Sequence, residues 1–295
     1  MRTDEQKQRD LERIAKYRGL EDQARALTSQ GDFSAETFQL TSKLLRLNPE
    51  YYTIWNARRR CLISGSFSRP SAGSSCSRAC SSTSRTATTA PSSTSCSSSS
   101  SAATPPGPAS RTAGTSGTTA DPNPETRRDD HDDEAATAAA AEAQDLSTIK
   151  SELGFTIPLL LESPKCYWIW SYRLWILQQA IARLRVPLAR KIWEEELGLA
   201  TKMLGKDRRN FHAWGYRRHV VAQLESPSLE GSSMVEAEFA YTDRMIQSDL
   251  SNFSAWHSRS KLIPRLLDER GADDAARRAF LDKGMSFFLA HWWEK

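Results

Sequence analysis

The stretch DRRNFHAWGYR, residues 207–217, recurs with changes three more times along this 295-residue chain. The other copies are NPEYYTIWNAR (48–58), SPKCYWIWSYR (163–173) and DLSNFSAWHSR (249–259). In every copy an aromatic residue stands three positions before a tryptophan, and an arginine stands three positions after it. Residues three apart lie on the same side of an α-helix. The pattern therefore predicts, in each copy, a helix with an aromatic–Trp–Arg face.

The period of the copies predicts how these helices are organised. Trp170, Trp214 and Trp256 are separated by 44 and 42 residues. Such a period is typical of stacked helical hairpins, with one pair of helices per repeat. Trp55 precedes Trp170 by 115 residues because a segment of different composition lies between them. No segment alternates apolar and polar residues as a strand does, so the sequence predicts an all-α, right-handed solenoid of helical hairpins.

The repetition also predicts roles for the repeated residues. The residue seven positions before each tryptophan can accept a hydrogen bond from a backbone N–H, and we expect it to cap the helix start. These residues are Asn48, Ser163, Asp207 and Asp249. A single active site does not need four copies, so we interpret the motif tryptophans and arginines as structural. They are Trp55 and Arg58, Trp170 and Arg173, Trp214 and Arg217, and Trp256 and Arg259.

Composition divides the chain into four parts. Residues 1–64 hold N-terminal helices and the first repeat, 145–270 hold three repeats, and 271–295 form a tail that repeats nothing. Residues 65–144 are rich in Ser, Thr, Ala, Pro and Gly and contain none of the nine tryptophans. Such a composition buries too little apolar surface to offset chain entropy, so it predicts a disordered insertion.

Several classes of function are disfavoured. A net charge of +4 is small for this length and does not by itself indicate nucleic-acid binding. The charged N-terminus is unlike a signal peptide, and no apolar run is long enough for a membrane span. Five cysteines, an odd number, favour a reducing compartment, and we expect a cytoplasmic protein. No metal-ligand spacing, activated nucleophile or Gly-rich phosphate loop occurs, so we expect no cofactor in this chain.

Three basic residues stand near the expected helix starts. Lys165 follows Ser163 by two positions, and Arg208 and Arg209 follow Asp207 directly. The first turn of a helix favours negative charge, so a cation there opposes the helix dipole. The sequence leaves two interpretations open. These cations are either solvated surface charge, or they form an anion site that faces a partner together with the helix N–H groups.

The repeats resemble those of the α subunits of protein prenyltransferases. Residues 41–49, 207–218 and 252–264 place the chain nearest to the Rab geranylgeranyltransferase (type II) members, in a fungal form, and the resemblance covers about 4–64 and 145–268. It implies a heterodimer in which a separate β subunit carries the catalytic zinc. Such an enzyme transfers geranylgeranyl from geranylgeranyl diphosphate to C-terminal cysteines of Rab GTPases, which a Rab escort protein presents. The chain alone is then expected to be inactive.

The resemblance also implies site residues. Pro164, Lys165 and Tyr167 match a segment whose lysine reaches the isoprenoid diphosphate and whose tyrosine lies beside the reacting centre. Phe211 stands where related subunits have a tyrosine, which leaves His212 as the polar candidate, with Arg208 and Arg209 facing the substrate or the partner. Two alternatives stay open: a helical-repeat adaptor without enzymatic role, and the α subunit of farnesyltransferase or type I geranylgeranyltransferase.

Overall fold

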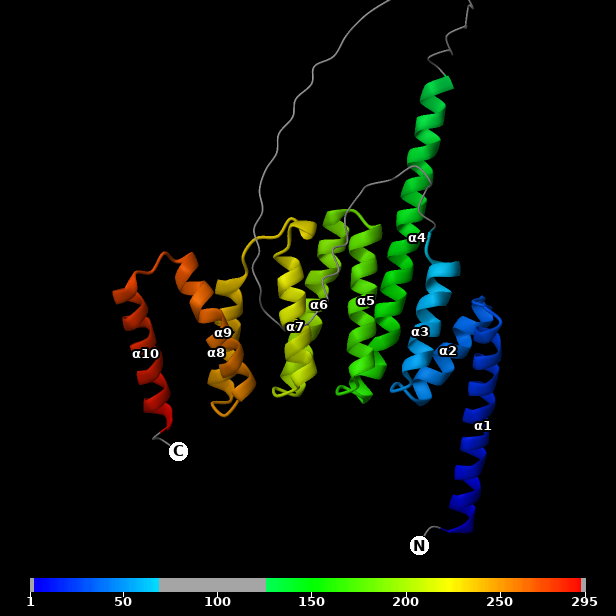
Figure 1. Cartoon of the computed structure of the whole chain (residues 1–295), viewed down its shortest axis with the longest axis horizontal. Coiled ribbons are helices and arrows are strands. Elements are labelled where there is room, and N and C mark those ends of the chain that lie inside the picture. Colours follow the sequence, from blue (N-terminus) through cyan, green and yellow to red (C-terminus); the bar gives the residue numbers. More distant parts are fainter. Residues whose placement is uncertain (1–2, 69–125, 293–295) are drawn as a thin grey trace, which may run out of the picture. The chain divides into compact units, whose positions relative to one another are not determined.

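A computed structural model describes residues 3–68 and 126–292, with side chains described for 3–68 and 133–284. Residues 1–68 and 136–295 form one compact unit, distinct from residues 69–135. The described residues contain helices and no strand. The α-helices, labelled in Figure 1, are α1 Asp4–Ser29, α2 Ala35–Leu47, α3 Tyr52–Cys61, α4 Thr126–Glu162, α5 Tyr167–Arg183, α6 Val186–Lys206, α7 Phe211–Leu224, α8 Val235–Ser248, α9 Phe253–Glu269 and α10 Asp274–Trp292. A π turn, Leu62–Ser66, follows α3, and a 3-10 turn, Pro227–Leu229, follows α7.

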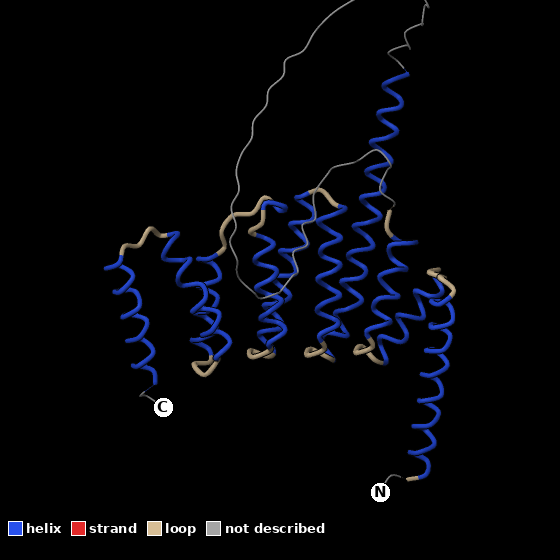
Figure 2. Tube along the Cα trace, in the orientation of Figure 1, coloured by secondary structure: helices blue, strands red, loops and turns tan. Residues whose placement is uncertain are grey.

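Eight of these helices form four hairpins, one for each copy of the motif: α2–α3, α4–α5, α6–α7 and α8–α9. Each motif lies at the turn of its hairpin and in the helix that follows. Figure 2 shows the four turns at one edge of the compact unit, and we call this the hairpin edge. The expected all-α architecture of repeated helical hairpins is confirmed.

The expected insertion, 65–144, has different bounds in the structure. On its N-terminal side, Phe67 is buried in the core and packs against Trp175. On its C-terminal side, α4 starts at Thr126, so the end of that range is helical. Asp145 of α4 accepts hydrogen bonds from the backbone N–H and the hydroxyl of Ser68, the N–H at 2.7 Å. The disorder expected for the rest falls on residues outside those described.

The predicted N-cap positions are wrong by three residues. Asn48, Asp207 and Asp249 are C-caps of the preceding helices, because only four residues separate the two helices of a hairpin. The N-caps stand four positions before each tryptophan. Two of them are asparagines whose side chains accept the N–H three residues on, as a cap does: Asn210 from Ala213 and Asn252 from Ala255.

One carbonyl in each turn explains why the tryptophan recurs. Trp55 donates its indole N–H to Pro49 at 2.8 Å, six residues earlier, and the other three motif tryptophans donate to the equivalent carbonyl at 2.8–2.9 Å. The N-cap residue of the next repeat donates to that same carbonyl. The three donors are Cys166 to Pro49, Asn210 to Pro164 and Asn252 to Arg208. Each tryptophan therefore fixes its own turn, and each turn is tied to the next one.

A buried ion pair joins each hairpin to the next. The motif arginine donates two N–H groups to a glutamate on the first helix of the following hairpin, with both side chains at most 10% exposed. The pairs are Arg58–Glu152, Arg173–Glu196 and Arg217–Glu238. Bidentate geometry of this kind is strong and directional. These pairs therefore set the register between neighbouring hairpins.

Tyrosines complete two of these junctions. Tyr172 donates its phenol O–H to Glu152 at 2.6 Å, and Tyr216 donates to Glu196. Burial raises the pKa of both phenols well above the ordinary value, and the adjacent glutamate raises it further. The phenols stay protonated and act as donors. The same tyrosine rings lie 4.6 and 4.9 Å from Trp55 and Trp170 of the preceding hairpin, so polar and apolar contacts coincide at each junction.

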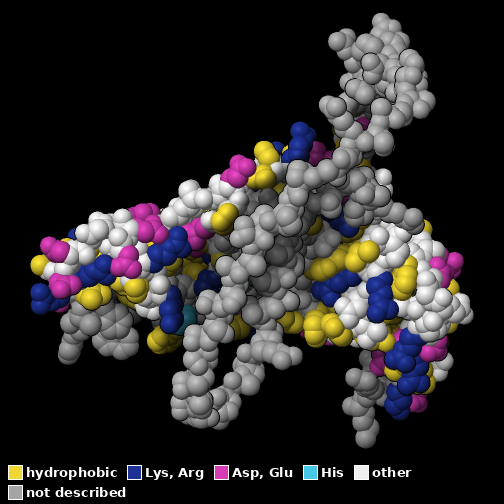
Figure 3. Space-filling model, turned by 45° about the horizontal axis from the view of Figure 1, so that its top comes forward, with side chains coloured by type: hydrophobic (Ala, Val, Ile, Leu, Met, Phe, Trp, Pro, Cys, Tyr) yellow, Lys and Arg dark blue, Asp and Glu magenta, His cyan; other side chains and the backbone are white. Residues whose placement is uncertain are grey.

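The surface in view in Figure 3 mixes hydrophobic, basic and acidic side chains rather than showing one sign of charge. None of the helices that the structure describes has an apolar stretch of membrane-spanning length.

Candidate functional site at the hairpin edge

A row of exposed aromatic side chains marks the hairpin edge. Tyr52, Tyr167, Phe211 and Phe253 are the first residues of α3, α5, α7 and α9, and they are 47–77% exposed. The expectation that the aromatic residue shares one helix face with the tryptophan and arginine is therefore wrong. Six residues advance a helix by about 600°, so the aromatic residue and the arginine lie about 120° apart around the axis. The tryptophan and arginine face the core, and the aromatic ring projects outward.

The aromatic rings are linked across three repeats. The centroid of Tyr52 lies 4.4 Å from that of Trp168, and Trp168 lies 5.0 Å from Tyr167. Tyr167 is 6.3 Å from His212, which is 5.8 Å from Phe211. The structure thus brings Tyr167 and His212 together from two different hairpins, α5 and α7. These five side chains form what we call the edge cluster.

Lys165 lies beside the edge cluster in an unexpected position. It is exposed and occupies the turn between α4 and α5, two residues before α5 starts, rather than the first helical turn. The argument that it opposes the helix dipole from within the helix is therefore wrong. The N-cap of α5, Cys166, makes no side-chain capping bond, so the first N–H groups of α5 have no side-chain cap. Within the described residues, Lys165 forms no ion pair.

Arg208 and Arg209 make contacts that hold the next repeat. Arg208 donates to the carbonyl of Ser248 at 2.9 Å. Arg209 donates to Asp249 at 3.2 Å and to Ser251 at 2.6 Å. Both side chains therefore tie the turn of the third hairpin to that of the fourth, and these contacts account for them without a ligand.

Arg59 lies near the edge cluster, although the repeated motif does not single it out. Its guanidinium lies 5.5 Å from the ring of Tyr172 and donates to Asn56 at 2.8 Å, while its Nε is buried without a hydrogen-bond partner among the described residues. Burial lowers the pKa of Arg59, and the nearby phenols of Tyr172, Tyr52 and Tyr167 oppose that shift. No described carboxylate pairs with it. Its signal in the sequence was weak, because it stands within a run of three arginines.

The described residues offer no metal centre. Across 3–68 and 126–292, no three His, Cys, Asp or Glu residues are placed to hold a metal ion. This part of the chain does not fit a catalytic zinc, and we derive no step through a metal here.

Comparison with known proteins identifies the family of this chain. A family model, the protein prenyltransferase alpha subunit repeat, matches residues 34–64, 149–180, 193–224 and 235–266. These four matches coincide with the four hairpins. The chain belongs to the protein prenyltransferase α-subunit family. The resemblance inferred from the motif is therefore confirmed.

Three curated relatives of this prenyltransferase α-subunit chain share the name geranylgeranyl transferase type-2 subunit alpha. The protein from Candida albicans is 31% identical over 263 residues, which is 88% of this chain and 51% of the relative. The Saccharomyces cerevisiae protein is 36% identical over 119 residues, 40% of this chain and 34% of its own length. The human protein is 42% identical over 118 residues, 40% of this chain and 18% of its own. The chain spans about half the length of the Candida relative.

Proposed function

We propose that this chain acts as the α subunit of a type-2 protein geranylgeranyltransferase. In this proposal it pairs with a β subunit, and the pair transfers geranylgeranyl from geranylgeranyl diphosphate to C-terminal cysteines of Rab GTPases. The repeats and the shared name of the relatives support the proposal. The observation that carries it is the hairpin edge, where exposed aromatic rings stand beside Lys165, an exposed lysine that forms no ion pair within the described residues.

The β subunit is proposed to dock along the hairpin edge. Aromatic side chains are enriched at protein interfaces, and contiguous exposed apolar surface marks interaction sites. The four edge aromatics recur once per repeat, so they present a regularly spaced row to a partner. Burial of their rings would supply association free energy that the isolated chain leaves unused. The catalytic zinc would belong to that partner.

Lys165 is the residue proposed to act on the substrate. Transfer breaks the bond between the isoprenoid carbon and the diphosphate oxygen and forms a carbon–sulfur bond, so negative charge develops on the leaving diphosphate. A lysine ammonium in a water-poor interface stabilises such charge more than it does in water. Tyr167 and His212, adjacent in the edge cluster, would then flank the reacting centre. In this proposal, Arg208 and Arg209 act through the turns that they hold.

The remaining expectations belong to the same proposal. The isolated chain would be inactive, because the described residues carry no metal site or activated nucleophile. A Rab escort protein would present the Rab substrate, and the complex would work in the cytoplasm.

Co-expression tests the docking step. The chain and a type-2 geranylgeranyltransferase β subunit should co-purify as a one-to-one complex. Tyr52→Ser and Phe211→Ser should each weaken that complex by about tenfold or more, because interface aromatics carry a large share of binding energy. Ile63→Ser is the matched control, since Ile63 is 54% exposed and lies in the π turn at the opposite end of α3 from Tyr52. Absence of a complex, or equal affinity of all variants, would contradict docking at this edge and favour an adaptor without enzymatic role.

A further inference from the structure

The fourth hairpin breaks the pattern of ion pairs between hairpins. Arg58, Arg173 and Arg217 have side chains at most 5% exposed, and each binds a glutamate from the following hairpin. The side chain of Arg259 is 20% exposed, and its only ion pair within the described residues is with Asp243 of its own hairpin, at 3.1 Å. Burial lowers the pKa of Arg259, and Asp243 opposes that shift without cancelling it. Arg259 is thus a partly desolvated cation whose charge is incompletely balanced by the described residues.

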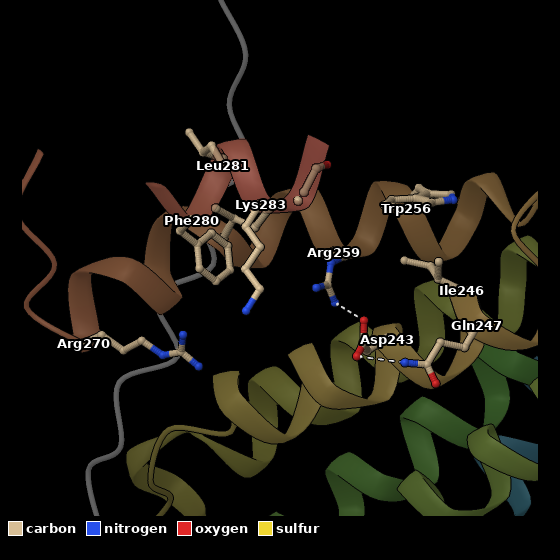
Figure 4. Close-up of a pocket in the computed structure, with 12 residues that line it drawn as sticks. Asp243, Ile246, Gln247, Trp256, Arg259, Arg270, Phe280, Leu281 and Lys283 are labelled. Carbon is tan, nitrogen blue, oxygen red and sulfur yellow. Dashed lines mark hydrogen bonds and ion pairs between the residues drawn. The ribbon is translucent and has the colours of Figure 1, made fainter. Parts of the chain in front are cut away.

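A cavity of about 650 Å³ opens beside Arg259, between α8, α9 and α10. Figure 4 shows Arg259 and its bond to Asp243 at the wall of this cavity, with Phe280 and Lys283 entering from α10. The apolar part of the lining includes Ile246, Ile263, Leu281 and the indole of Trp256. The charged part is Arg259 and Lys283 against Asp243, because Arg270 is already paired with Glu236 at 2.6 Å. The cavity is therefore apolar with an excess of positive charge.

The three earlier junctions show what such a surface binds in this protein. At each one, the surface formed by the motif tryptophan and arginine is covered by helices of the next hairpin. A glutamate from the first of those helices meets the arginine, and apolar residues pack around it. Trp256 and Arg259 present the equivalent surface to the cavity. The charge and apolar character of the cavity therefore match the apolar face of a helix that carries one carboxylate.

We propose that this cavity is a docking groove for one amphipathic helix of a partner protein, which places a glutamate on Arg259. The groove binds that helix as the preceding hairpins bind α4, α6 and α8. Recognition follows the helix-in-groove mode, with apolar anchors on one helical face and an ion pair that fixes the register. This inference does not depend on the proposed transferase function.

A helix taken from the chain itself provides the probe. A fluorescein-labelled peptide of residues 186–206 carries Glu196 on the face that α6 turns toward an arginine. It should bind the full chain saturably in fluorescence anisotropy. The Glu196→Gln peptide should bind about tenfold more weakly, as expected for loss of a charged hydrogen-bonded pair. The Arg259→Gln chain should show the same loss, and the Gln peptide should lose nothing further on that chain.

Controls separate the groove from nonspecific attraction. Lys261→Gln removes an exposed cation two residues from Arg259, outside the cavity lining, and should leave binding unchanged. Absence of saturable binding, or equal affinity for the wild-type and Arg259→Gln chains, would overturn the proposal. Binding of laurate that depends on Arg259, without peptide binding, would overturn it in favour of a small anionic amphiphile. The effects of Asp282→Asn and Arg259→Gln on the unfolding free energy should add. A non-additive effect would show that α10 itself supplies the carboxylate that pairs with Arg259, and it would overturn the proposal.

Discussion

Removal of Glu196 should destabilise the chain far more than removal of its neighbour Glu195. Glu196 holds both the Arg173 guanidinium and the Tyr216 phenol, and the side chains of this ion pair are only 1% and 5% exposed. In Glu196→Ala, Arg173 keeps only neutral acceptors, the carbonyl of Leu153 among them at 2.6 Å. Breaking a buried pair in this way leaves an uncompensated charge, and the expected loss of unfolding free energy is about 3–5 kcal/mol.

The experiment is urea unfolding followed by tryptophan fluorescence and circular dichroism. Glu195 is exposed, so Glu195→Ala should change the unfolding free energy by less than about 0.5 kcal/mol. The double variant Arg173→Met/Glu196→Leu should recover most of the loss, because apolar residues of similar volume often replace a buried pair without penalty. A loss below about 1 kcal/mol for Glu196→Ala would refute the idea that these pairs hold the hairpins together. So would a double variant as unstable as the single one.

Three further predictions concern the turns, the long insertion and the cysteines. Asn210→Ala removes a helix cap and the bond to the preceding turn, and it should lower the unfolding free energy by about 1–2 kcal/mol in the same urea assay. Replacement of residues 70–135 by a short Gly-Ser linker should keep the helical circular dichroism and the unfolding midpoint of the compact unit, because Ser68 is already bonded to Asp145; loss of cooperative unfolding would contradict this. Burial raises the pKa of Cys61 to about 11 and also raises that of Cys166, so at pH 8 both thiols are protonated and covered. The test uses a variant with serine at the other three cysteines, Cys76, Cys80 and Cys96. In this variant Ellman's reagent should react with Cys61 and Cys166 only after urea unfolds the chain. Rapid reaction of the native chain would refute the burial of these two thiols.

The sequence predicted the hairpins well because their signal is repeated. The tryptophan spacing of 44 and 42 residues is a long-range regularity that local propensity cannot produce by chance. The helix caps were misplaced for a local reason. Asn48 is the C-cap of α2, and α3 begins only four residues later. A capping residue in so short a turn can therefore belong to the end of one helix or to the start of the next.

The glutamates of the buried pairs were missed although their positions are regular. Glu152, Glu196 and Glu238 each precede a motif tryptophan by 18 residues. The first repeat has Thr37 at that position, which hides the column when four copies are compared. The reason is physical, because within the described residues only the single helix α1 precedes the first repeat, and no earlier hairpin offers it an arginine. Each of these glutamates pairs with an arginine of the preceding repeat, so its role becomes visible only in the structure, where neighbouring repeats are in contact.

The candidate site was predictable in part. Tyr167 and His212 come from different hairpins, and their adjacency in the structure follows from the repeat spacing. The sequence did not indicate that Arg209 would be held by Asp249, because that contact spans 40 residues between two turns. Nor did it indicate Arg59, whose environment depends on rings from two hairpins.

The most direct test of the proposed function measures transfer itself. The chain, a type-2 geranylgeranyltransferase β subunit, an escort protein and a Rab substrate are combined with radiolabelled geranylgeranyl diphosphate, and the single-turnover rate is measured. The account predicts transfer that requires both subunits. It also predicts that Lys165→Ala lowers the rate by about tenfold or more while the complex stays intact, with partial recovery in Lys165→Arg. An unchanged rate in Lys165→Ala would remove Lys165 from the site, and absence of transfer by an assembled wild-type complex would contradict the proposed function.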